Sequence, residues 1–209
     1  MLRLRLGLLG WAGLLAAPGS AQGPAAKPAP ETRRYAIEVA GLRVGTMTAT
    51  RQPQAGTTDA VLTLTSDVQV SILFYNLTIY YQVVNRVRNG RLLLSTVEAH
   101  TNQGNFSSRT EWKTDHYDIV ADQYKHHYRA TETRPITYTV TDMFFGEPRN
   151  QARAFAEYFG DYFTLGRTAT GPYAARRAGR EDEYQYSGGR LVTIIKKNPV
   201  KNFVIRWLP

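Results

Sequence analysis

The four histidines of the sequence are the side chains best suited to act as a general base or as metal ligands. Glu98 and His100 are two residues apart, so they share one face of a strand, and Asp115 precedes His116 near an expected turn. A carboxylate next to an imidazole can orient it for proton transfer. A site assembled from these four residues across neighbouring strands would make the protein an envelope hydrolase.

Other catalytic and metal-binding patterns are missing. His126 and His127 are adjacent, so on a strand they point to opposite faces and do not readily hold one ion. The chain has no cysteine and no Gly-x-Ser-x-Gly nucleophile elbow. Gly188-Gly189 leads into a further strand instead of a helix N-terminus, which argues against a phosphate-binding loop. We therefore predict no catalytic residue, no metal and no cofactor, and a protein that is not an enzyme.

Aromatic residues recur on successive expected strands. Ordinary packing in a core explains most of them. The sharper hypothesis is that one concave face of a sheet forms an aromatic-lined groove for an apolar, amphiphilic or glycan ligand. The residues expected to contact such a ligand are Phe74, Tyr81, Trp112, Tyr124, Tyr128, Tyr138, Phe144 and Phe145.

Apolar and polar residues alternate along most of the chain after about residue 31. Period-two alternation is typical of strands with one buried and one solvated face. It is clearest in 62–70, where leucine and valine alternate with polar residues, and in 203–207. Further strands are expected at 109–114, 117–121, 124–131 and 136–140.

Glycine-containing turns separate several of these runs. Asn89-Gly90 lies between 79–87 and 92–100, and this dipeptide accepts the positive φ angles of a tight hairpin. Ala40-Gly41 and Ser187-Gly188-Gly189 separate strand-like runs in the same way. Each turn predicts a neighbouring antiparallel pair.

The region 141–159 interrupts the alternation. Thr141-Asp142 can cap a short helix that Pro148 ends. Phe155 and Phe159 are four residues apart, which is compatible with a second short helix or with a loop that enters a strand. Either segment could lie across one face of the sheet as a plug or lid.

These elements define the expected fold class. Ten or more strands joined by short turns, with one or two short helices near 141–159, predict an all-β domain. The alternatives are a curved antiparallel sheet, a half-barrel, a barrel or a sandwich. Strands of around ten residues at 79–87 and 92–100 favour the curved sheet or barrel, because sandwich strands are usually shorter.

The N-terminus has the pattern of an export signal. Arg3 and Arg5 precede an apolar run at 6–15, and small residues at 18–21 suit cleavage before Gln22. The run is shorter than the roughly twenty apolar residues of a membrane-spanning helix, and no later stretch qualifies. We predict a cleavable signal peptide at 1–21, a flexible Pro/Ala-rich linker at 22–30 and one β domain at 31–209, in a periplasmic or secreted protein.

The formal net charge is +9, or +7 once the two arginines of the signal are removed. A basic excess favours anionic envelope surfaces such as lipid head groups. The basic residues are dispersed through turns, so a solvated surface is the plainer interpretation, and no nucleic-acid partner is expected. Without cysteine, the domain must rely on its hydrophobic core.

Four sequence features occur in order along the chain: Tyr35-Ala-Ile-Glu-Val-Ala-Gly-Leu-Arg-Val-Gly45, Arg88-Asn-Gly90, Met143-Phe-Phe-Gly-Glu-Pro148 and Tyr184-Gln-Tyr-Ser-Gly-Gly189. Together they resemble a family of exported bacterial proteins designated Domain of Unknown Function 6134, over nearly all of 31–209. The resemblance implies a β-rich fold similar to the half-barrels of periplasmic lipoprotein carriers. It carries no catalytic residue over to this chain.

Three functions follow, in order of preference. The first is a non-catalytic envelope binding or carrier protein, whose curved sheet holds a lipophilic or amphiphilic ligand while a basic rim attracts its anionic head. It predicts a continuous apolar cavity. The second is a structural or interaction module that pairs through an exposed strand edge, and it predicts a packed interior with an uncovered edge. The third is the envelope hydrolase.

Overall fold

The computed structural model describes residues 28–55, 57–72, 75–102, 104–123, 126–197 and 202–209. This part of the chain forms strands and a single 3-10 turn, η1 (Asp142–Phe144). The strands are β1 (Glu31–Val39), β2 (Leu42–Pro53), β3 (Ala60–Ile72), β4 (Tyr75–Arg88), β5 (Arg91–Thr101), β6 (Gly104–Trp112), β7 (Tyr117–Gln123), β8 (His126–Glu132), β9 (Arg153–Ala156), β10 (Asp161–Arg167), β11 (Tyr173–Arg177), β12 (Arg180–Ser187), β13 (Arg190–Lys196) and β14 (Phe203–Leu208).

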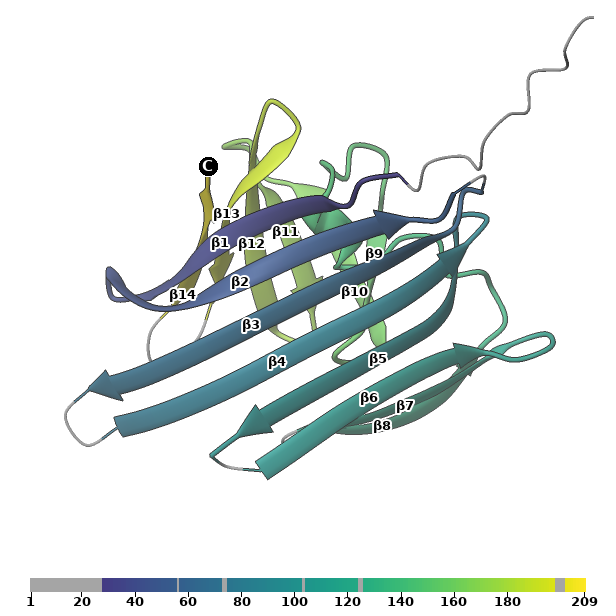
Figure 1. The fold of residues 1–209 in the computed structure, drawn as a ribbon, viewed down its shortest axis with the longest axis horizontal. Helices are drawn as coiled ribbons and strands as arrows, with labels where there is room; N and C mark the ends of the chain where they lie inside the picture. The colour runs from purple at the N-terminus through teal and green to yellow at the C-terminus, as the bar shows by residue number, and fades with distance from the viewer. Residues whose placement is uncertain (1–27, 56, 73–74, 103, 124–125, 198–201) are drawn as a thin grey trace, which may run out of the picture.

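All of these strands belong to one antiparallel sheet. Its order is β8-β7-β6-β5-β4-β3-β2-β1-β14-β13-β12-β11-β10-β9, so every pair of sequence neighbours except β8 and β9 is hydrogen-bonded, and β1 also pairs with β14. The sheet curves, with the long strands β1–β6 in front and β9–β14 behind them (Figure 1). The edge strands β8 and β9 are not paired with each other, so the sheet is not closed into a barrel. The predicted all-β curved sheet is confirmed.

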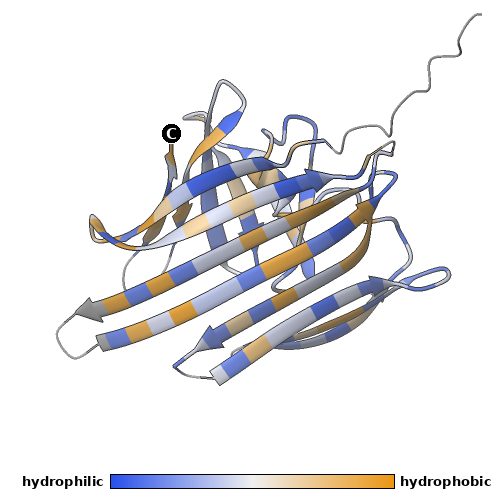
Figure 2. Cartoon of the chain, in the orientation of Figure 1, coloured by the Kyte–Doolittle hydropathy of each residue, from blue (hydrophilic) through white to orange (hydrophobic). Residues whose placement is uncertain are grey.

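The curvature brings the two halves of the sheet into contact. Ser108 Oγ on β6 donates to the carbonyl oxygen of Tyr158 at 2.8 Å, and the rings of Tyr81 and Tyr158 are 6.2 Å apart. Tyr158 directly follows β9, which is one edge of the sheet, whereas β6 lies near the other edge. Hydrophobic and hydrophilic residues alternate along β3 and β4 (Figure 2), as expected for strands with one face turned inward.

The expected hairpins are present. Asn89 and Gly90 have φ angles of 50° and 70° between β4 and β5, as a tight primed turn requires. Ala40-Gly41 joins β1 to β2, and Gly188-Gly189 joins β12 to β13, also with positive φ. The turn residues therefore predicted these three antiparallel pairs correctly.

One expected strand is wrong. Residues 136–140 form only an isolated parallel bridge, between Thr139 and Phe155, and not a strand of the sheet. Ile136 is buried and its carbonyl accepts from Leu92 N at 2.8 Å. Apolar residues and threonines alternate along 136–140 in the sequence, but the buried residues are Ile136 and Thr139, so the sequence pattern does not reflect the two faces of a strand.

The region 141–159 contains one short helical turn. Thr141 is the N-cap residue of η1 but makes no side-chain capping bond. Instead, the Asp142 carboxylate accepts from Thr139 N at 2.9 Å and from Thr139 Oγ1 at 2.8 Å. Around Phe155 the chain is a loop that enters a strand, β9, and not a second short helix.

Buried apolar side chains form two clusters. The larger joins η1 to inward residues of β1–β5 and β9–β14 and includes Tyr35 and Tyr184, whose exposed fractions are 0%. The smaller cluster lies between β5, β7 and β9 and consists of Leu92, Tyr117, Ile119, Ile136 and Phe155.

Candidate functional site

The connection between the edge strands, residues 133–152, has exposed ends and a centre, around Met143 and Phe144, that is buried in the core; we call this connection the plug. Its Met143 and Phe144 are 0% and 3% exposed and belong to the larger core cluster. The Phe144 ring meets that of Tyr35 on β1 edge-on, with 5.5 Å between centroids. The plug therefore packs as part of the core.

Side chains of β1 and β12 donate hydrogen bonds to backbone carbonyls of the plug. Arg33 on β1 donates from Nη1 to Phe144 O at 2.7 Å and from Nη2 to Phe145 O at 2.9 Å. Tyr186 on β12 donates from its hydroxyl to Met143 O at 2.8 Å. These carbonyls lie at the end of η1, where a short helical turn leaves acceptors without partners of its own. Side chains of the sheet thus supply hydrogen-bond donors to carbonyls at the end of η1.

A buried polar cluster lies beside the plug. Glu157 Oε1 accepts from Asn85 Nδ2 at 2.7 Å and from Thr141 N at 3.1 Å, and Asn85 Nδ2 also donates to Thr139 Oγ1 at 3.3 Å. Burial raises the pKa of Glu157, and the hydrogen bonds from Thr141 and Asn85 oppose that effect only in part. The carboxyl group is therefore biased toward its neutral form.

The hydroxyl of Tyr184 and Asn85 Oδ1 are buried without a hydrogen-bond partner in the described part of the chain. Burial holds the pKa of Tyr184 well above its ordinary value, and the charges of Asp182 and Glu157 raise it further. Unpartnered buried polar atoms are uncommon in folded proteins. Since Asn85 and Tyr184 are both 0% exposed, this cluster is closed to solvent while the plug is in place.

A cleft of about 460 Å³ opens at the C-terminal end of the plug, against β10 and β11. Its centre is Glu147, which accepts from Arg149 Nε at 3.0 Å, Arg167 Nη2 at 3.2 Å and the Tyr173 hydroxyl at 3.2 Å. Arg149 holds the pKa of Glu147 below its usual value, with help from Tyr173 and Arg167. The side chain of Glu147 is 10% exposed, whereas those of Arg149 and Arg167 are 72% and 64% exposed.

The predicted aromatic contacts that the structure describes are divided between the two core clusters. Phe74 and Tyr124 lie outside the described residues. Tyr138, Phe144 and Phe145 on the plug and Tyr81 on β4 pack in or against the larger core cluster. Trp112 and Tyr128 instead pack against the smaller cluster.

The expected acid and histidine pairs form separately. His100 Nε2 lies 3.9 Å from Glu98 Oε2, and His116 Nδ1 lies 2.6 Å from Asp115 Oδ1. The register places His100 opposite Asn105 at one end of β6, whereas His116 precedes β7 at the other end. At about 3.3 Å per residue, the seven residues from Asn105 to Trp112 span roughly 23 Å. The four side chains therefore do not form one site.

No group of three or more histidine, aspartate or glutamate side chains in the described ranges is placed to hold a metal ion. His126 Nε2 lies 3.0 Å from the carbonyl oxygen of Phe159, and His127 Nδ1 lies 3.2 Å from Asp122 Oδ1. The two rings thus have separate surroundings, as their adjacency predicts. Within the same part of the chain, no helix has the length and apolar character needed to cross a membrane.

Sequence reasoning missed the buried cluster and the cleft. Asn85 occupies an inward position between Val83 and Val87, and Glu157 follows the buried run Ala154–Ala156. A polar residue at an inward position of an alternating strand could have identified Asn85, and an acidic residue within the otherwise apolar run 154–159 could have identified Glu157. Arg149 and Arg167 are distant in sequence, so only the fold reveals their shared partner Glu147.

The fold and these sites define a curved antiparallel-sheet protein with an internal plug. In the MFFGEP segment (143–148), Met143 and Phe144 contact Tyr186 and Tyr35 of the sheet. The last two residues of the segment line the cleft. The chain belongs to the family described as Domain of unknown function (DUF6134), whose model matches residues 35–207. The comparisons with curated proteins and with solved structures gave no match.

Proposed function

We propose that the protein is a non-catalytic, exported binding protein of the cell envelope that holds an amphiphile on the concave face of its sheet. In this proposal the plug covers the apolar face in the free protein and moves aside for the ligand. Met143 and Phe144 then occupy the place that an apolar chain takes in the complex.

The observation that supports the proposal most directly is how the plug is attached. It contributes no strand to the sheet in the described part of the chain, and η1 is fastened by side-chain donors such as Arg33 and Tyr186. Displacing η1 would leave the pairing of β1–β14 intact, while backbone hydrogen bonds of Ile136, Tyr138 and Val140 keep the start of the plug on β5 and β9. It would uncover Tyr35, whose ring lies against that of Phe144 with 5.5 Å between centroids.

The test combines extraction with a binding assay. Lipid bound to the purified protein would be extracted into organic solvent and identified by mass spectrometry, and N-phenyl-1-naphthylamine fluorescence would report an accessible apolar site. Tyr186→Phe removes one plug bond, so we expect it to increase probe binding. Tyr80→Phe, on the exposed face, is the matched control. The absence of both extractable lipid and probe binding in folded wild-type and Tyr186→Phe protein would exclude the proposal.

A second candidate function is strand-edge association between two copies. The interior is packed, and β8 pairs with β7 alone in the described residues. An unpaired strand edge is a template for another strand. Light scattering during size exclusion, with amide hydrogen exchange of 126–132, tests this idea: dimerisation should protect the edge amides. A monomer at all concentrations would eliminate it.

A further inference from the structure

The cleft at the end of the plug gathers two cationic side chains around one nearly buried carboxylate. Arg149 comes from the plug and Arg167 from the end of β10, and Glu147 accepts a hydrogen bond from each. Two guanidinium groups repel each other, so the carboxylate between them holds the pair in place. The three groups carry a net charge of +1.

These contacts also orient the guanidinium groups. Arg149 uses Nε for Glu147, while Arg167 uses Nη2 for Glu147 and Nε for Gly171 O at 3.1 Å. Within the described residues, both Nη atoms of Arg149 and Nη1 of Arg167 have no acceptor. These three nitrogens remain available as charge-assisted donors, two on Arg149 and one on Arg167, which suits the several oxygens of a phosphate group.

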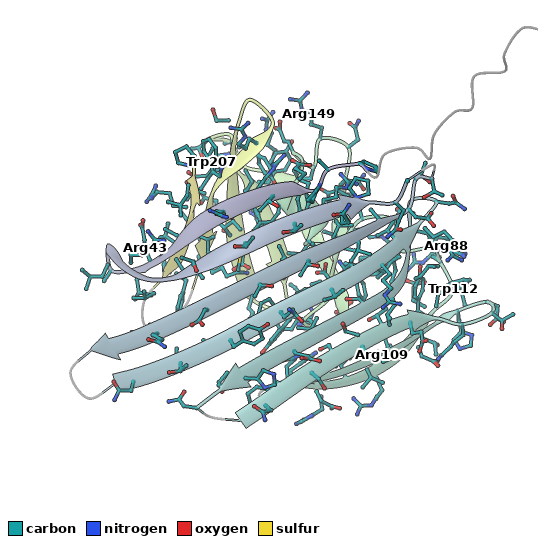
Figure 3. The ribbon with its side chains drawn as sticks, viewed as in Figure 1. Arg43, Arg88, Arg109, Trp112, Arg149 and Trp207 are labelled. Atoms are coloured by element: carbon teal, nitrogen blue, oxygen red, sulfur yellow. The ribbon has the colours of Figure 1, made fainter. Side chains whose placement is uncertain are left out.

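The size and walls of the cleft indicate that more than a bare ion fits. About 460 Å³ is within the range of small-molecule sites, whereas a phosphate group alone needs far less. Pro148, Leu165 and Tyr173 supply apolar surface, and Gln151 supplies an amide. Arg149 lies at the outer surface near the β12–β13 turn (Figure 3), where a Cβ on Gly189 would be 4.0 Å from its Nη2.

We propose that the cleft formed by Glu147, Arg149, Arg167 and Tyr173 binds a phosphate group that carries a small organic substituent. Arg149 and Arg167 bind the phosphate oxygens. Glu147 is a positioning residue, and the substituent lies against Pro148 and Leu165. The site is open while the plug is in place, so it does not depend on ligand binding to the concave face.

Two sources of this chemistry can be separated experimentally. Soluble glycerol 3-phosphate and inorganic phosphate would be titrated into the 15N-labelled protein, with chemical shifts of the cleft residues followed by NMR. In parallel, flotation would measure binding to vesicles of phosphatidylglycerol and of phosphatidylcholine. Binding of glycerol 3-phosphate indicates a free phosphate ester, whereas binding only to phosphatidylglycerol vesicles indicates a lipid head group.

Arg149→Gln is the main variant, because Arg149 is mostly exposed and its loss leaves the Arg167 bond to Gly171 intact. Arg109→Gln is the control, since Arg109 is also exposed and pairs with one carboxylate, Glu111, away from the cleft (Figure 3). We expect Arg149→Gln to weaken binding of whichever source is active by about tenfold, a typical effect of losing a charge-assisted contact. Arg109→Gln should change it by less than about twofold.

Two results would overturn the site. One is the absence of shift changes at the cleft with both soluble phosphates, together with no preference for phosphatidylglycerol vesicles. The other is equal weakening by Arg149→Gln and Arg109→Gln, because binding would then reflect the overall positive charge. Thermal melts would confirm that the variants compared are folded.

Discussion

The guanidinium group of Arg33 donates from Nη1 to the carbonyl oxygen of Phe144 at 2.7 Å, joining the first strand to the end of η1. Its Nη2 donates to Phe145 O and also lies 2.6 Å from Glu31 Oε1. One side chain of β1 thereby satisfies two carbonyls of a segment more than a hundred residues away in the sequence.

We predict that Arg33→Met lowers the free energy of unfolding by about 2 kcal/mol, because it leaves partly buried carbonyls without a charge-assisted donor. Arg34→Met is the matched control, since Arg34 is exposed on the other face and makes no side-chain hydrogen bond in the described structure. Urea denaturation followed by circular dichroism measures both variants. Equal stability of the two would show that Arg33 does not hold the plug.

The hydroxyl of Tyr117 links β5 to the start of the plug. It donates to Leu92 O at 2.7 Å and accepts from Ile136 N at 3.2 Å, and the side chain is 0% exposed. We predict a loss of about 2 kcal/mol in Tyr117→Phe, since a buried donor and a buried acceptor both lose their partner. Thermal denaturation should show almost no loss in Tyr80→Phe, because Tyr80 is exposed and its hydroxyl accepts only a surface hydrogen bond from Gln82. Comparable melting temperatures would contradict this account.

The all-β fold class and three hairpins of the sheet could be predicted from local features of the sequence. Asn89-Gly90 defines a hairpin because both residue types accept positive φ angles, and in Ala40-Gly41 the glycine gives the same signal. Inward residues such as Leu62 and Leu64 follow strict alternation. Both signals act within a few residues, so one sequence is enough to read them.

The plug could not be placed in this way. Apolar and polar residues alternate along 136–140 as they would in a strand. The segment nevertheless forms no strand of the sheet: Ile136 accepts a hydrogen bond from Leu92, and Thr139 makes an isolated bridge with Phe155. The pairing of β1 with β14 was likewise absent from the prediction. Long-range contacts of this kind depend on how the whole sheet curves.

The candidate sites were mostly missed for the same reason. Glu147, Arg149 and Arg167 meet only because the plug ends beside β10. The aromatic residues chosen from the sequence are divided between two clusters, since inward side chains of a wide curved sheet reach different parts of its interior. Local patterns identify which residues face inward, but they do not specify what those residues meet there.

Gly45 marks a close approach between β2 and β3. A Cβ at this position would lie 2.2 Å from Asp67 O and 2.9 Å from the Cα of Val68, both backbone atoms. We predict that Gly45→Ala costs about 3 kcal/mol, because relief requires a shift of one strand. Gly146→Ala, where a Cβ meets nothing within 4 Å, should change stability by less than about 0.5 kcal/mol. Chemical denaturation that shows equal effects would refute the close contact.

The buried carboxyl group of Glu157 predicts a specific dependence of stability on pH. Burial raises its pKa in the folded protein, whereas an unfolded glutamate titrates near about 4.3. Between these two pKa values the folded state binds more protons, so its stability falls as pH rises from about 4 toward the raised pKa. Glu157→Gln retains an oxygen that can accept from Asn85 and Thr141 but cannot ionise.

We therefore expect Glu157→Gln to gain stability relative to wild type as pH increases from 4.5 to 8, measured by urea denaturation at each pH. Asp142, whose pKa is also raised by burial, is present in both proteins, so the difference isolates Glu157. Glu111→Gln should show the opposite sign and at lower pH, losing stability relative to wild type as pH rises toward about 5, because hydrogen bonds from Lys113 and Arg109 lower the pKa of Glu111 and its ionisation stabilises the fold. If the free energies of unfolding of wild type and Glu157→Gln change in parallel with pH, Glu157 titrates alike in the folded and unfolded chains. That result would contradict a neutral buried acid beside the plug.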